Sequence, residues 1–226
     1  MDIAEKVLRA KTDLDEVYEA GKKAEYDELW DSFEHEWEMM YRFAGVVWND
    51  TTFKPKYDIV VGPYNCTGLF MLNRVSNLKQ ILLNCGVRLD LSKCVNFLNG
   101  FRYSHITTLP EIDLSNSDNV DGCFADMTKL KSIDKVTFKD GINFNVSFSN
   151  VTELEEIRIG GTISGNGFNV SWSTFLTHDS LMSIINALAD KSGTGTTFTI
   201  TLGTENLAKL TDAEKAIATQ KGWSFG

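Results

Sequence analysis

A short apolar–polar–apolar pattern recurs four times in the middle of this chain, and it restricts the fold more than any other feature. The pattern stands at the centre of VRLDLSK (87–93), PEIDLSN (110–116), DKVTFKD (134–140) and EEIRIGG (155–161). Successive centres are 23, 24 and 21 residues apart. Alternation with a period of two residues is typical of a β-strand with one buried face. Each repeat is therefore predicted to contribute one short strand.

Apolar residues outside these strands repeat as well. Phe124 and Phe148 each stand six residues before a leucine, and FNVSFSN (144–150) returns as FNVSWST (168–174). A unit of about 20–29 residues cannot bury its own apolar face, so units of this length stack on one another. The chain is predicted to be an α/β leucine-rich-repeat solenoid with short parallel strands. The alternative, an antiparallel sandwich, requires regularly placed hairpin turns, which the sequence lacks.

The N-terminal segment has a helical pattern instead. Apolar residues alternate in steps of four and three, as in a coiled coil; these heptad positions are Ile3, Val7, Ala10, Leu14 and Val17. This arm is predicted to be a coiled-coil-like helix that associates with other copies, or else a single helix that packs on its own domain. Eight aromatic residues follow within 26–53. Their helical spacing favours packing in an aromatic cap over a carbohydrate platform.

The predicted domains are therefore a helical arm with its aromatic cap, 1–45, and a repeat domain, 46–226. The repeat domain is predicted to end in a helix–strand–helix cap. The first helix has Thr177 as its N-cap, and the last has a capping box between Thr211 and Glu214, with Gly222 after its end.

The net charge of −9 is confined to the N-terminal part. Residues 1–50 hold fourteen acidic and six basic side chains, so this segment carries −8 and the remainder only −1. Nucleic acids and anionic membranes bind through basic surfaces, so neither is an expected partner. No run approaches the roughly 18–20 apolar residues that cross a bilayer, so no membrane insertion is expected.

Patterns that carry catalytic or metal chemistry are weak. His35 lacks the partner of an H-E-x-x-H motif, and His178-Asp179-Ser180 lies on one helical turn, where a catalytic triad cannot assemble. No catalytic residue, metal site or cofactor is predicted. The cysteines have no C-x-x-C spacing and are predicted to be buried thiols, a Cys85–Cys94 disulfide being the alternative; the four are Cys66, Cys85, Cys94 and Cys123.

The F-x(5)-L-x-x-I spacing combined with a short strand resembles the BspA-type leucine-rich repeats of bacterial surface proteins. A closer resemblance is to proteins of this kind encoded by prophages and gut bacteria; it is carried by AEYDELWDSF, WNDTTFKPKYDIV, LTHDSLMSIINAL and TLGTENLAKLTDAEKAIATQKGW. The resemblance implies a non-enzymatic recognition module that binds a protein or glycan on a bacterial cell. It also implies that the protein is located on a phage tail or on a bacterial surface. As a tail appendage, the protein is expected to form a homotrimer through its N-terminal helix. It transfers no binding residue.

The polar residue at the centre of each strand is expected to point away from the core. We therefore expect these residues to form a polar ladder on one face of the sheet, which consists of Asp90, Asp113, Thr137 and Arg158, extended by Thr201. The ladder is either the binding surface or a set of ordinary solvated strand positions. The alternative function is that of a structural or assembly protein of a phage particle, a spacer or decoration with no external ligand. The N-terminus has no secretory signal pattern. Three interpretations remain open: a signal peptide has been removed, the protein leaves the cytoplasm by another route, or it stays in the cytoplasm.

Overall fold

The computed structural model describes residues 58–60, 65–72 and 75–226, which form short parallel strands and four helices. All of them belong to one compact unit, Val47–Gly226. The predicted arm, its heptad residues and the aromatic cap lie outside the described residues.

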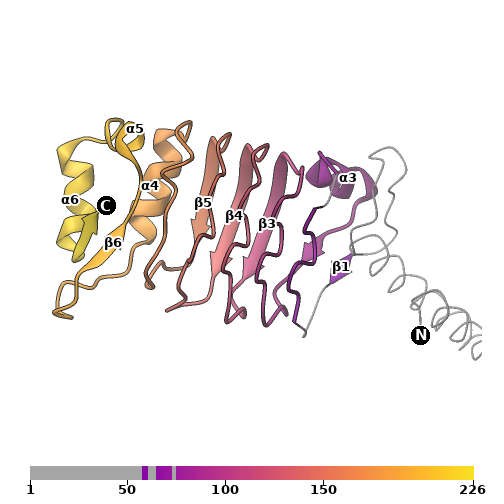
Figure 1. Cartoon of the computed structure of the whole chain (residues 1–226), viewed down its shortest axis with the longest axis horizontal. Helices are drawn as coiled ribbons and strands as arrows, with labels where there is room; N and C mark the ends of the chain where they lie inside the picture. Colours follow the sequence, from indigo (N-terminus) through magenta and orange to yellow (C-terminus); the bar gives the residue numbers. More distant parts are fainter. Residues whose placement is uncertain (1–57, 61–64, 73–74) are drawn as a thin grey trace, which may run out of the picture. The chain divides into compact units, whose positions relative to one another are not determined.

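The described strands form three parallel sheets (Figure 1). The first pairs β1 (Ile59–Val60) with β2 (Leu89–Asp90), and helix α3 (Leu78–Cys85) lies between them in sequence. The central sheet has the order β3-β4-β5, and its strands are Thr108–Leu114, Ser132–Phe138 and Glu156–Gly160. All four predicted strand centres therefore coincide with strands, and the predicted α/β class with parallel strands is confirmed.

The C-terminal part contains the remaining elements, which are α4 (His178–Ala187), β6 (Phe198–Ile200), α5 (Thr204–Leu207), α6 (Asp212–Gln220) and β7 (Trp223–Phe225). β6 and β7 form the third sheet. The predicted caps are confirmed: the Thr177 hydroxyl accepts the Ser180 N–H, and Thr211 and Glu214 form a capping box. Gly222 follows α6 in the left-handed conformation, with a φ of 83°.

Backbone hydrogen bonds also join successive repeats on the segments that follow the strands. The Leu72 N–H donates to the Arg102 carbonyl at 3.0 Å, the Tyr103 N–H to Ala125 at 3.1 Å, and the Asp126 N–H to Ser149 at 2.8 Å. The repeats of β1 and β2, and those of β3 and β4, thus bond to one another through their strands and again through the turn-rich segments that follow. This double connection explains why the apolar pattern recurs with a nearly constant period.

A row of phenylalanines runs through the core between these two connections. Ring centroids are 4.6, 5.7, 5.1 and 5.3 Å apart along the row, which consists of Phe70, Phe101, Phe124, Phe148 and Phe168. All five side chains are buried, as expected for Phe124 and Phe148. Offset aromatic pairs at such distances contribute about 0.5–1.5 kcal/mol each beyond the burial of their area. We refer to these five residues as the phenylalanine row.

The register between β4 and β5 differs from the predicted one. Ile133 pairs with Ile157 and Val136 with Ile159, so two residues of β4 lie opposite the single residue Arg158. Thr137 consequently pairs with Gly160 and not with Arg158. The strand centres Thr137 and Arg158, which are 21 residues apart, are therefore not register partners, because a bulge in β4 gives a spacing of 24 at one end of the pair and 23 at the other.

Helix α4 occupies the edge of the central sheet where a further strand would lie (Figure 1). The Ser180 hydroxyl accepts the Ile157 N–H at 3.0 Å and donates to the Glu155 carbonyl at 3.2 Å. The Ser183 hydroxyl accepts the Ile159 N–H at 2.9 Å. Side chains of the helix therefore satisfy the β5 edge and replace the hydrogen bonds of a missing strand.

Replacing Ser180 by alanine should lower the free energy of unfolding by about 1–3 kcal/mol, because the buried Ile157 N–H loses its acceptor. Urea unfolding followed by circular dichroism measures the change. Ser192→Ala is the matched control, because this hydroxyl contacts only the exposed Asp190 carboxylate. An equal loss in both variants would contradict the role assigned to Ser180.

The cysteines are present as thiols, so the alternative Cys85–Cys94 disulfide is not formed. Cys66, Cys94 and Cys123 are buried as predicted, whereas Cys85 is only half-buried. The Cys94 sulfur faces Cys66 instead of Cys85. Burial raises the pKa of the Cys123 thiol.

Candidate functional site

The five residues of the predicted ladder do not form one row. Asp113 and Thr137 are paired in register on the central sheet, but Asp90 belongs to the β1–β2 sheet. Thr201 is bridged to Asn169 in the C-terminal part. Arg158 lies opposite the bulge, next to neither Asp113 nor Thr137 in register.

Two of the ladder carboxylates close turns within the chain. Asp90 Oδ1 accepts the Ser92 N–H at 2.9 Å, and Asp113 Oδ1 accepts the Ser115 N–H at 2.9 Å. Such a bond ends the strand in a tight turn. Hydrogen bonds from the Ser92 hydroxyl and N–H hold the pKa of Asp90 below its ordinary value. The repeated Asp-Leu-Ser sequence therefore has a structural role at both positions.

A groove lies where the outer faces of β4 and β5 meet the N-terminal half of α4. It encloses about 870 Å³ and contains Arg158 but neither Asp113 nor Thr137. Its other polar residues come from three strands and the helix; they are Glu111, Asp134, Lys135, Glu156, Thr177, Asp179, Ser180 and Ser183. We refer to this surface as the β4–β5 groove.

Three of the charges in the groove are neutralised by ion pairs. Lys135 forms an ion pair with Glu111, and Asp134 forms one with Lys79 of α3, at 2.5 Å. Neither the Arg158 guanidinium nor the Glu156 carboxylate makes a hydrogen bond or ion pair with any described residue. Both side chains are exposed on β5. A cation and an anion on the same strand are thus left available to a ligand.

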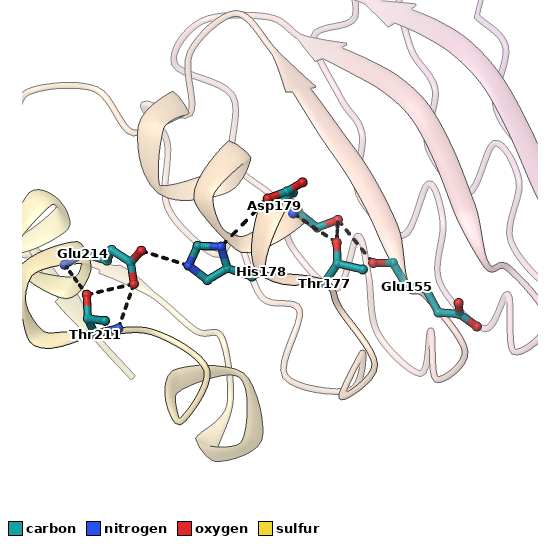
Figure 2. A network of polar contacts seen from close by, with 7 residues as sticks. Glu155, Thr177, His178, Asp179, Thr211 and Glu214 are labelled. Carbon is teal, nitrogen blue, oxygen red and sulfur yellow. Dashed lines mark hydrogen bonds and ion pairs between the residues drawn. The ribbon is translucent and has the colours of Figure 1, made fainter.

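Polar contacts hold the α4 end of the groove in place (Figure 2). Thr177 Oγ1 lies 2.9 Å from the Ser180 hydroxyl, which in turn donates to Glu155 of the preceding repeat. The His178 ring lies between Glu214 and Asp179, with its Nε2 2.8 Å from Glu214 Oε1. These bonds attach the start of α4 both to β5 and to the start of α6.

The same contacts determine the role of the His178-Asp179-Ser180 sequence. The His178 ring bonds to Glu214 and the Ser180 hydroxyl is used by backbone groups, so the two do not bond to one another. Hydrogen bonds from the Thr211 N–H and hydroxyl, with a smaller effect of His178, lower the pKa of Glu214. His178 therefore joins α4 to α6, and Ser180 joins α4 to β5.

Two exposed aromatics were not expected from the repeat pattern. Trp172 stands 24 residues after the buried Phe148, yet 53% of Trp172 is exposed, and Phe175 is 64% exposed. Two side chains hydrogen-bond to the backbone of the turn that carries them. Asn206 Nδ2 donates to the Ser173 carbonyl at 3.0 Å, and Lys209 Nζ donates to the Thr174 carbonyl at 2.8 Å. The phenylalanine row uses Phe168 here, which frees Trp172 to face solvent.

Within the described ranges, no group of three or more His, Cys, Asp or Glu side chains is placed to bind a metal ion. No helix there is both long and apolar enough to span a bilayer. Comparison of the chain with protein-family models, with curated proteins and with solved structures finds no match.

Proposed function

We propose that the protein is a non-enzymatic recognition module and that the β4–β5 groove is its binding site. The observation that carries the proposal is Arg158, an exposed guanidinium in a groove whose other cation, Lys135, is already paired. A guanidinium offers five donors in a planar fork that matches a carboxylate. The Glu156 carboxylate, which makes no hydrogen bond or ion pair with any described residue, adds an acceptor on the same strand.

The composition of the groove favours a protein segment over a glycan as the ligand. Its lining residues include six charged side chains and no aromatic ring. Without an aromatic ring the groove offers no stacking surface to a sugar ring, whereas charges of both signs select a protein segment with a complementary pattern. The hydroxyls of Thr177 and Ser183 supply further hydrogen-bonding groups along the groove.

We further propose that the fold is a leucine-rich-repeat solenoid of the BspA type. The parallel strands, the second line of hydrogen bonds between repeats and the phenylalanine row support this proposal. A solenoid exposes its strand face as an extended binding surface, which is where the β4–β5 groove lies. The proposed location is a phage tail or a bacterial surface, with the chain trimerised through the N-terminal heptad positions.

Binding of the full-length protein to a panel of intact gut-bacterial strains tests the function. Reversal of a charge that meets its partner in a desolvated contact typically costs tenfold or more in affinity, so Arg158→Glu should weaken binding by about that factor. Lys93→Glu changes the net charge equally on an exposed side chain outside the groove and should bind normally.

Equal binding by the two variants would contradict a role for the groove. If the unaltered chain binds no strain at all, the second candidate gains support, namely a structural or assembly protein of a phage particle that acts as a spacer.

A further inference from the structure

Two buried cysteines from neighbouring repeats lie against each other, away from the groove. The Cys66 and Cys94 sulfurs are 2.7 Å apart although the residues are 28 positions apart in the sequence. A disulfide bond is about 2.05 Å long, so the sulfurs are roughly 0.65 Å from bonding distance. Moving each sulfur by half of this difference takes a rotation of roughly 10° about each Cα–Cβ bond, which stays within one rotamer well.

The backbone on both sides keeps the sulfurs together. The Cys66 N–H donates to the Asn96 carbonyl at 2.7 Å, and residues 65 and 96 form a parallel bridge. The Cys94 N–H donates to the Leu91 carbonyl at 2.9 Å, and the Cys94 carbonyl accepts the Ser117 hydroxyl at 2.8 Å. Both cysteines are therefore fixed by the hydrogen bonds that join the repeats.

We propose that Cys66 and Cys94 form a disulfide that links these two repeats covalently, by exchange with an external disulfide. The Cys66 thiolate attacks one sulfur of the external disulfide, and its other sulfur leaves as a thiolate. Cys94 then loses its proton to that thiolate or to water and attacks the Cys66 sulfur, expelling the second thiol. The protein loses two protons and two electrons in total, and one external disulfide is reduced to two thiols.

The two thiols differ in accessibility and in pKa, as this order of reaction steps requires. Both cysteines are buried, but Cys66 is 4% exposed and Cys94 is completely buried, so Cys66 is the more accessible of the two. The hydrogen bond from Cys94 lowers the pKa of Cys66, which favours its thiolate as the first nucleophile. The same contact and burial raise the pKa of Cys94, so Cys94 stays protonated until the mixed disulfide has formed.

Oxidised glutathione is the probe that tests the cross-link in the full-length protein. After oxidation, denaturation and N-ethylmaleimide treatment, the intact mass should show two modified cysteines where the reduced protein shows four. Peptide mapping should find a link between Cys66 and Cys94. The melting temperature should rise by about 5–10 °C, because a bridge of this span restricts the unfolded chain, and dithiothreitol should reverse the rise.

Cys85→Ser should retain both the cross-link and the rise in melting temperature, whereas Cys94→Ser should lose both. Four modified cysteines after oxidation, or a link that includes Cys85 or Cys123, would overturn the proposal. The mass measurement on the unaltered chain does not depend on the folding of any variant. The outcome is also independent of the groove, so either proposal can fail without the other.

Discussion

Replacing Phe124 by alanine should lower the free energy of unfolding by about 3–5 kcal/mol. Phe124 is completely buried in the phenylalanine row, with its ring centroid 5.7 Å from Phe101 and 5.1 Å from Phe148. Truncation removes the contacts with both neighbours and leaves a cavity in the middle of the stacked repeats. Guanidinium unfolding of the variant and the unaltered chain, followed by circular dichroism, measures the difference.

Phe175→Ala is the control for this experiment, because it removes the same side chain from a position that is 64% exposed. Its free energy of unfolding should change by less than about 0.5 kcal/mol. A small effect of Phe124→Ala, similar to that of the control, would mean that the row does not hold neighbouring repeats together.

Replacing Gly165 by alanine should lower the free energy of unfolding by about 3 kcal/mol. This loss is at or above the upper end of the range for substitutions that overpack a core. A Cβ at this position would lie 1.7 Å from the Ile142 carbonyl oxygen and 2.4 Å from its carbon. The obstacle is the backbone of the preceding repeat, which cannot move aside without breaking the connection between the repeats. The midpoint of thermal unfolding should fall accordingly.

Gly193→Ala provides the comparison, because a Cβ there meets no atom within 4 Å. This variant should unfold at the same temperature as the unaltered chain or slightly above it. If Gly165→Ala behaved in the same way, neighbouring repeats would have to be more loosely packed than the structure indicates.

The repeat pattern predicted the strands well because burial of alternate residues is a local property of the sequence. Ile112 and Val136 occupy equivalent core positions, as their sequence alignment indicates. The register of β5 was not predictable in this way. Ile133 and Val136 are both buried although they are three residues apart, so the apolar pattern alone allows Ile157 to lie opposite either of them. Only the bulge in β4 decides between them.

The candidate site was predictable only in part for the same reason. Arg158 was identified as an outward-facing residue, and it lies in the β4–β5 groove. Its predicted neighbours followed the wrong register, so Lys135 and Glu156 were missed although they occupy outward positions on the same strands. The contribution of α4 depends on Ser180 and Ser183 reaching the edge of the sheet. No repeat pattern contains that information.

The measurement that tests the recognition role of the groove most directly is photo-crosslinking from within it. Glu156 is replaced by p-benzoylphenylalanine in the full-length protein, because it is exposed in the groove and has no partner among the described side chains. The same replacement at the exposed Glu205 of α5 serves as the control. After irradiation on cells that bind the protein, we expect a crosslinked bacterial surface protein from position 156 and none from position 205. Crosslinking from position 205 alone would contradict the account and place the binding surface outside the groove.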